Sequence, residues 1–132
     1  MVAISNPVRY KAGLYVRLSN EAIESTSAGV TTNSVEAEME RESGSITNQK
    51  RFLKDFCSEC GIEIYKIYAD DGYSGANFNR PSFKEMIRDI EDGKINLVIV
   101  KDLSRFGRVS SKVTYYTDEY FPEHRVRFVA VN

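Results

Sequence analysis

The chain has 132 residues, enough for one domain with a single hydrophobic core. Its composition, 42% hydrophobic and 28% charged, is that of a globular protein, and no apolar run has the length of a signal-peptide core or a membrane span. The net charge is −1, but residues 20–42 hold six acids and one base, so the remainder carries 17 bases against 13 acids. This uneven distribution permits a phosphate-bearing partner without demonstrating one.

The first predicted element is a strand over residues 13–19, "GLYVRLS", which is rich in β-favouring side chains. Residues 20–44 follow and are rich in Ser, Thr and Glu, with no sustained apolar period. They are predicted to form a long acidic insertion with a short helix near 34–42. Loops of this length inside a compact domain are uncommon and tend to be functional or disordered.

A helical period begins at Ser45, the predicted N-cap, and ends before Gly61, which suits the C′ position. The side chains predicted to share its apolar face are Ile46, Leu53, Phe56, Cys57 and Cys60. The two cysteines form a lone Cys-x-x-Cys in a chain with a single histidine, so a four-ligand zinc site is disfavoured. We expect ordinary reduced cysteines in or near the core.

Residues 62–69 alternate as a strand, and residues 70–80, "DDGYSGANFNR", have the composition of a loop. Pro81 then suits the first turn of a helix that ends near Gly93. The predicted apolar face of this helix consists of Phe83, Met86, Ile87 and Ile90. Asp70, Asp71 and Ser74 are interpreted as turn residues, because the bends of such a loop need Asp, Gly and Ser.

Residues 95–100, "INLVIV", form an unbroken apolar strand of the kind that is covered on both faces. A helix is predicted over 109–121, ending before Pro122, and a last strand over 126–131. Alternating strands and helices predict an α/β fold with three layers, an open and mostly parallel sheet with helices on both faces. One domain over 1–132 is expected, and because the chain ends on a strand we expect it to be a fragment of something longer.

Ligands of open parallel sheets bind at the carboxyl ends of the strands. Arg17 and Ser19 follow the first strand, and Ser104, Arg105 and Arg108 follow the apolar one. Arg80 closes the 70–80 loop, and Gln49 lies near the start of the first helix. Guanidinium groups bind phosphate oxygens bidentately and can neutralise a phosphodiester under attack by a serine without a metal ion.

Other site classes fit the sequence less well. There is no Gly-rich phosphate loop, no HExxH pair and no acidic metal cluster, and the lone His124 stands far from Ser19 in the chain. Tyr15 is interpreted as a core residue and Asp102 as a local cap or ion-pair partner. The aromatic residues at 115, 116, 120 and 121 are interpreted as helix packing. The base that would deprotonate Ser19 stays open between Asp102 and a second arginine.

Four blocks in order, "YVRLS" (15–19), "SITNQ" (45–49), "DDGYSGANFNRP" (70–81) and "KDLSRFGR" (101–108), resemble the serine site-specific recombinases of the resolvase/invertase superfamily. The likeness is greatest to large serine recombinases and transposon-type members. It implies that Ser19 attacks a DNA phosphate to give a 5′-phosphoserine and a free 3′-OH. The residues that it implies around the scissile phosphate are Arg17, Arg80, Arg105, Arg108 and Gln49.

The resemblance also implies a resolvase-like catalytic domain that works on double-stranded DNA as a dimer or tetramer of the full-length protein, without metal, ATP or another cofactor and without a membrane. Lys101 and Lys112 are expected to contact DNA beside Arg80, Arg105 and Arg108. A cytoplasmic protein of a bacterium, phage or mobile element is expected.

The chain departs from the pattern in the 20–44 insertion and in Ser104, where small resolvases usually have an acid although large members often have serine. We also expect it to be a fragment without the dimerisation helix and DNA-binding domains that should follow. The alternatives are a catalytically silent DNA-organising domain of the same fold and a flavodoxin-like phosphate or nucleotide binder.

Overall fold

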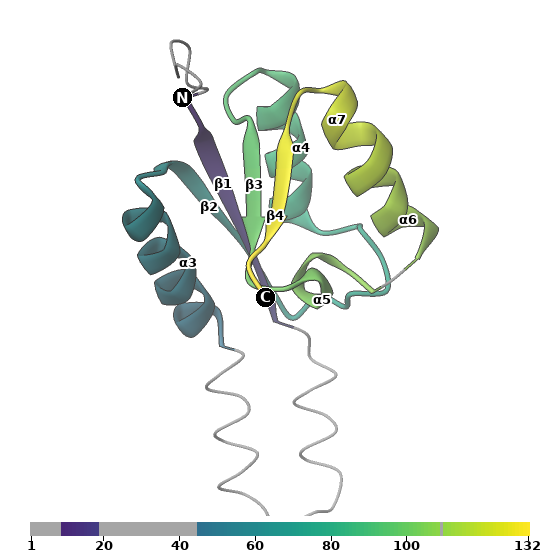
Figure 1. The fold of residues 1–132 in the computed structure, drawn as a ribbon. Helices are drawn as coiled ribbons and strands as arrows, with labels where there is room; N and C mark the ends of the chain where they lie inside the picture. Colours follow the sequence, from purple (N-terminus) through teal and green to yellow (C-terminus); the bar gives the residue numbers. More distant parts are fainter. Residues whose placement is uncertain (1–8, 19–44, 109) are drawn as a thin grey trace, which may run out of the picture.

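The computed structural model describes residues 9–18, 45–108 and 110–132. Its sheet has four parallel strands in the order β2-β1-β3-β4 (Figure 1). Their bounds are Lys11–Leu18 for β1, Glu63–Asp71 for β2, Leu97–Val100 for β3 and Arg127–Ala130 for β4. Helix α3 covers one face and the remaining long helices cover the other, so the predicted three-layer α/β fold is confirmed.

The helices are α3 (Ile46–Cys60), α4 (Pro81–Glu91), α5 (Leu103–Phe106), α6 (Ser111–Thr114), the π-helix η1 (Tyr115–Tyr120) and α7 (Phe121–Glu123). Local sequence signals set their ends. Ser45 caps α3 by accepting from the N–H of Asn48, and Gly61 ends it with a φ of 67°. Pro81 occupies the first turn of α4, as predicted.

The predicted end of the last helix before Pro122 is wrong. Helical structure runs from Ser111 to Glu123, because residues 115–120 form a π-helix in which the N–H of Phe121 donates to the carbonyl of Tyr116, five residues back. Inside an α-helix a proline ring clashes with the carbonyl four residues earlier, but Pro122 lies in the first turn of α7, directly after the π-helical segment. Residue 109, where this helix was predicted to begin, lies outside the described residues.

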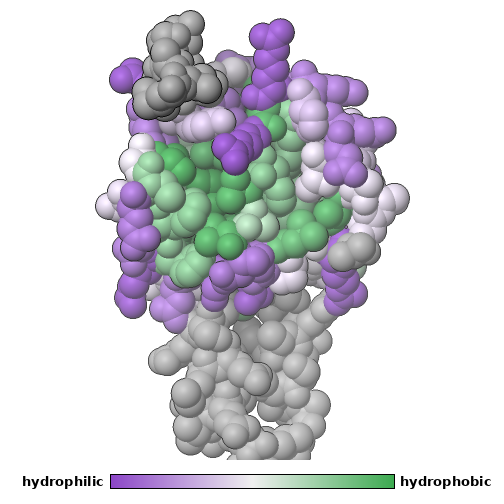
Figure 2. Space-filling view, in the orientation of Figure 1, coloured by the Kyte–Doolittle hydropathy of each residue, from purple (hydrophilic) through white to green (hydrophobic). Residues whose placement is uncertain are grey.

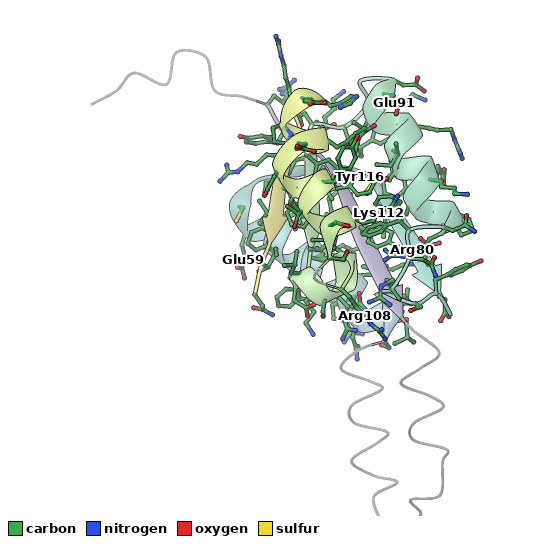
Figure 3. The ribbon with its side chains drawn as sticks, turned by 90° about the vertical axis from the view of Figure 1, so that its right-hand side faces the viewer. Glu59, Arg80, Glu91, Arg108, Lys112 and Tyr116 are labelled. Atoms are coloured by element: carbon green, nitrogen blue, oxygen red, sulfur yellow. The ribbon has the colours of Figure 1, made fainter. Side chains whose placement is uncertain are left out.

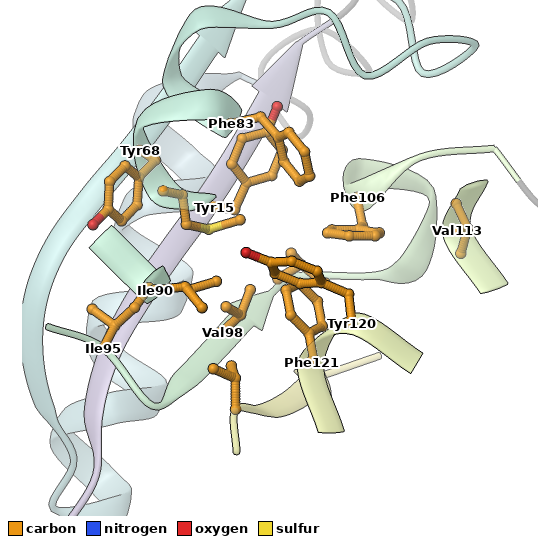
Figure 4. Close-up of a cluster of buried hydrophobic side chains, with 13 residues drawn as sticks. Tyr15, Tyr68, Phe83, Ile90, Ile95, Val98, Phe106, Val113, Tyr120 and Phe121 are labelled. Carbon is orange, nitrogen blue, oxygen red and sulfur yellow. The ribbon is translucent and has the colours of Figure 1, made fainter. Parts of the chain in front are cut away.

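Two apolar layers hold the helices to the sheet. Alternate residues of β1 point to opposite faces: Leu14 and Val16 pack with α3, and Tyr15 packs with α4 and the π-helical segment. The second layer is rich in aromatic rings, including Phe83, Phe106 and Phe121 (Figure 4). Tyr15 is fully buried, as predicted.

Apolar surface also gathers where β4 runs between α3 and α7 on the face shown in Figure 2. β4 is an edge strand that pairs with β3 on one side, and its residues Phe128, Val129 and Ala130 are half-buried. Each is packed against one of the two apolar layers. The core therefore extends to this edge of the sheet.

Three buried tyrosines predict a loss of stability at alkaline pH. Tyr15, Tyr68 and Tyr120 donate hydrogen bonds to carboxylates at 2.6–2.8 Å, and burial raises the pKa of each hydroxyl above its usual value. The folded state thus favours the protonated phenol. The three tyrosines therefore contribute their full stabilisation below the unfolded-state pKa of about 10. As the pH rises above this value, the free energy of unfolding falls by up to ~1.4 kcal/mol per pH unit for each tyrosine.

We expect the melting temperature, followed by circular dichroism, to decline steadily from about pH 10 upward. Tyr68→Phe should make this decline shallower, because one of the contributing phenols is removed. A melting temperature that stays constant through pH 11 would contradict the expectation.

Candidate active site

The carboxyl ends of the parallel strands meet at one rim of the sheet, the lower end in Figure 1. Three segments converge there: the end of β1 with Arg17, the loop of residues 72–80 that follows β2, and the turn of residues 101–108 that contains α5. Figure 3 shows Arg80 and Arg108 toward this rim and Glu91 at the opposite end. The described arginines that the sequence nominated lie in or beside these segments.

Arg17 is buried, with 5% of its surface exposed. Each of its side-chain nitrogens donates to a main-chain carbonyl: Nε to Arg105 at 3.1 Å, Nη1 to Tyr73 at 2.8 Å and Nη2 to Ser104 at 2.7 Å. The guanidinium therefore joins the end of β1 to both rim loops.

Gln49, on α3, holds the main chain of Arg17. Its Oε1 accepts from the N–H of Arg17 at 3.2 Å, and its Nε2 donates to the carbonyl of Arg17 at 2.9 Å. The side chain is fully buried, so these bonds satisfy main-chain groups at the end of β1. Ser19, two residues later, lies outside the described residues.

Arg80 is also fully buried. Nε donates to the carbonyl of Asn77 at 2.8 Å, and Nη1 donates to the carbonyl of Phe106 at 2.7 Å and to the hydroxyl of Tyr15 at 3.1 Å. Its Cζ lies 4.5 Å from the centre of the Phe78 ring. Nη2 is buried and has no hydrogen-bond partner within the part of the chain that the structure describes.

Arg105 and Arg108 belong to the α5 turn. Asp102 caps α5 by accepting from the N–H of Arg105 at 3.1 Å, which confirms its predicted role as a local cap. The Nε of Arg105 forms a long ion pair with the same carboxylate at 4.0 Å, too far for a hydrogen bond, and this buried nitrogen has no hydrogen-bond partner among the described residues. Arg108 is exposed, and its main-chain N–H donates to the carbonyl of Gly75 at 3.0 Å.

The interpretation of Asp70 as a turn residue is wrong. Asp70 is the penultimate residue of β2, 2% exposed, and accepts from the hydroxyl of Tyr15 and from the N–H groups of Ser82 and Phe83 at 2.8–3.0 Å. It therefore caps α4 from the end of β2, across the intervening loop, and the sequence carries no local signal for such a contact. Ser74 does serve a turn, because its Oγ accepts from the N–H of Ala76.

The remaining nominated residues lie around this rim or away from it. The Nζ of Lys101 is 5.6 Å from the centre of the Phe52 ring, and Lys112 is exposed on α6 (Figure 3). His124 precedes β4, at the opposite end of the sheet, and stacks on Tyr120. Cys57 is buried as expected, whereas Cys60 is exposed, and both are free thiols.

The rim has the chemistry of an anion site. Buried N–H donors nearly always have partners, and one without a partner costs about 1–3 kcal/mol. The Nη2 of Arg80 and the Nε of Arg105 are two such donors, and both carry positive charge. An anionic oxygen would satisfy them best. Within the described ranges no three His, Cys, Asp or Glu side chains are grouped to hold a metal ion, and no helix there is long and apolar enough to span a bilayer.

Comparison with known proteins identifies relatives over most of the chain. The profile of the family described as "Resolvase, N terminal domain" matches residues 12–132. "Uncharacterized immunity region protein 3" of Bacillus phage phi105 is 37% identical over 81 residues, which are 61% of this chain and 79% of that protein.

Solved structures with the same fold include the N-terminal catalytic domain of TP901-1 integrase, with a TM-score of 0.73 and 24% identity over 92% of this chain and 77% of that one. A resolvase family site-specific recombinase from Streptococcus pneumoniae is 28% identical, with a TM-score of 0.59 over 92% of this chain and 72% of that chain.

Proposed function

Because the chain belongs to the resolvase N-terminal domain family, we propose that it is the catalytic domain of a serine recombinase that cleaves and rejoins duplex DNA through Ser19. Family and fold indicate resolvase-type recombination. The observation that carries the chemical step is the pair of buried guanidinium N–H groups of Arg80 and Arg105 at the rim, which have no hydrogen-bond partner among the described residues. Ser19 directly follows β1 in the sequence, and β1 ends at this rim.

In the proposed step the Oγ of Ser19 attacks phosphorus, and the P–O3′ bond breaks as the Oγ–P bond forms. The products are a 5′-phosphoserine and a 3′-hydroxyl, and the hydroxyl of an exchanged strand reverses the step to rejoin the DNA. The ester retains the energy of the broken bond, so no ATP is needed. Nearby guanidiniums favour the serine anion and stabilise the charge on the phosphate oxygens.

The site residues are Ser19, Arg17, Arg80, Arg105, Arg108 and Gln49. Arg105 and Arg108 are the best placed of these for phosphate contact, because one presents an unpartnered donor and the other is exposed. Lys101 and Lys112 would contact neighbouring phosphates. The partner is double-stranded DNA, bound by a dimer or tetramer of the protein, and the phage relative supports an origin in a mobile element.

A trapping experiment tests this function without knowledge of the target site. The protein is incubated with a pool of duplexes of random sequence in which the scissile 3′-oxygens are replaced by sulfur, so that cleavage releases a 3′-thiol that rejoins poorly. Mass spectrometry after nuclease and trypsin digestion should find the nucleotide phosphate on Ser19. The absence of an adduct would contradict the proposal, and stabilisation by nucleotides without any adduct would favour the flavodoxin-like alternative.

A further inference from the structure

Helix α3 carries three basic side chains on the face that points away from the sheet. Arg51 and Lys54 are exposed and Lys50 is half-buried, and with Thr47 and Asp55 they line a hollow on this face. Residues at this spacing, i, i+3, i+4, i+7 and i+8, share one side of an α-helix. None of them belongs to the apolar layer under α3. Lys50, Arg51 and Lys54 therefore form a positive row on the outer surface, here called the basic row.

The charges of α3 are ordered against its helix dipole. Acids near the first turn and bases near the last turn stabilise a helix. The first turn of α3 holds no acid and its last turn holds no base, and the acids Asp55 and Glu59 follow the basic row toward the carboxyl end. Lys50 and Lys54 also repel each other across one turn. The basic row therefore stands where the helix itself disfavours positive charge.

Carboxylates within the described ranges do not neutralise the basic row. The ion pairs formed there involve Lys66, Lys94 and Arg105, and none includes a side chain of α3. Exposed ammonium and guanidinium groups in a row attract a partner that carries several negative charges. The row is thus complementary to a polyanion.

The basic row begins beside the candidate active site. Gln49, the residue before Lys50, holds the main chain of Arg17 at the rim. The earlier end of α3 lies toward the rim in Figure 1 and its later end lies away from it. Lys101 follows β3 at the rim, and its Nζ lies 5.6 Å from the centre of the Phe52 ring of α3. Positive charge thus continues from the rim onto the outer surface of α3.

We propose that the basic row binds the phosphate backbone of duplex DNA next to the phosphate held at the rim. The inference rests on the proposed function for its partner. Each strand of a duplex carries one phosphate per ~3.4 Å of helix axis, so DNA with one phosphate at the rim continues past it on both sides. Lys112 lies on the side of the sheet covered by α6, and the basic row lies on the side covered by α3.

The dimensions of the basic row suit a single strand of the duplex. Lys50 and Lys54 are one turn apart, ~6 Å along the helix axis, which is about two phosphate intervals of one strand. Contacts to phosphates fix the position of a protein on DNA and carry no sequence information directly. The basic row would therefore contribute affinity and orientation at any sequence, and not the choice of target site.

DNA binding at a series of salt concentrations tests the proposal. One variant removes the basic row: Lys50→Gln, Arg51→Gln and Lys54→Gln. Its control removes three exposed bases at the opposite end of the sheet: Lys11→Gln, Lys94→Gln and Arg127→Gln. Both variants lose three positive charges, so they match in any general effect of net charge. The probe is a fluorescently labelled duplex of random sequence, followed by anisotropy, and circular dichroism establishes that both variants are folded.

We expect the variant without the basic row to bind about tenfold or more weakly than the control. The slope of log K against log salt should become less steep by about 0.9 for each phosphate contact removed. The control should keep the wild-type slope. Equal affinity and slope in the two variants would overturn the proposal, and so would wild-type protein that shows no salt-dependent binding.

Lysine acetylation gives a second readout that needs no substitution. The wild-type protein is acetylated with and without saturating duplex DNA, and mass spectrometry measures the modification of each lysine. DNA should protect Lys50 and Lys54 and leave Lys94 equally reactive. If Lys50 and Lys54 are already unreactive without DNA, another part of the protein covers them and the proposal fails. Equal reactivity with and without DNA would overturn it too.

The proposed function and the basic row can fail separately. An adduct on Ser19 of the wild type, together with equal DNA binding by the two variants, would remove the basic row and leave the function standing. The absence of an adduct, together with weaker binding by the variant without the row, would contradict the function and leave the row as a DNA-binding surface.

Discussion

Replacing Ser19 with alanine is expected to abolish the covalent protein–DNA adduct. Alanine has no side-chain oxygen, so no bond to phosphorus can form at this position and the two-step exchange cannot begin. Removal of a serine nucleophile costs on the order of 10⁶ in rate in other enzymes, which places the variant below detection in a trapping assay. The measurement is adduct yield on the 3′-thio duplex pool, by denaturing gel and by mass spectrometry.

Ser58→Ala is a matched control, because Ser58 is exposed on α3, away from the rim. It should form the adduct at the wild-type level. Melting temperature and circular dichroism establish that both variants are folded. An adduct of Ser19→Ala in wild-type yield would mean that another residue is the nucleophile and would remove the basis of the proposed step.

The elements with local signals could be predicted from the sequence. Ser45 and Gly61 bound α3, and Pro81 begins α4, because caps and proline act on the turn in which they stand. Apolar runs in the sequence locate the strands, and these strands pair in the sheet. Their order and parallel direction agree with the alternation of strands and helices along the chain.

Contacts between distant segments could not be predicted in the same way. Asp70 caps a helix that begins 11 residues later and binds a hydroxyl 55 residues earlier in the chain, so composition alone assigned it to a turn. Pro122 was expected to end its helix because prolines do so in α-helices. The segment before it is a π-helix whose residues Tyr116 and Tyr120 pack in the aromatic layer, and the spacing of apolar residues in the sequence does not distinguish a π turn from an α turn.

The location of the rim could be predicted from the sequence, but the burial of each arginine could not. Carboxyl ends of parallel strands meet, so residues after β1 and β3 had to be neighbours. Whether an arginine side chain is buried depends on which main-chain carbonyls lie close enough to accept its hydrogen bonds. In the structure such carbonyls surround Arg17 and Arg80, whereas Arg108 is exposed. The role of Ser19 and the form of residues 20–44 remain predictions.

Arg105→Ala and Arg108→Ala are each expected to slow DNA cleavage by about 10²–10³, the usual cost of removing one preorganised donor from a charged transition state. Neither side chain belongs to the two apolar layers, so both variants should remain folded. Single-turnover adduct formation at saturating DNA isolates the chemical step from binding. Lys112→Ala is the comparison: as a phosphate contact alone it should weaken binding and lower the salt dependence, with little change in the saturated rate.

Lysine variants sharpen the test, because they keep the charge and change the shape of the donor. Arg105 is half-buried, and its Nε has no hydrogen-bond acceptor among the described residues, so its function should depend on the planar guanidinium. Arg108 is exposed, and a compact ammonium there can still approach a phosphate. Arg108→Lys should therefore retain more cleavage than Arg105→Lys. Near wild-type cleavage by both alanine variants would mean that these guanidiniums do not stabilise the reacting phosphate, and that the buried donors of the rim serve another acceptor.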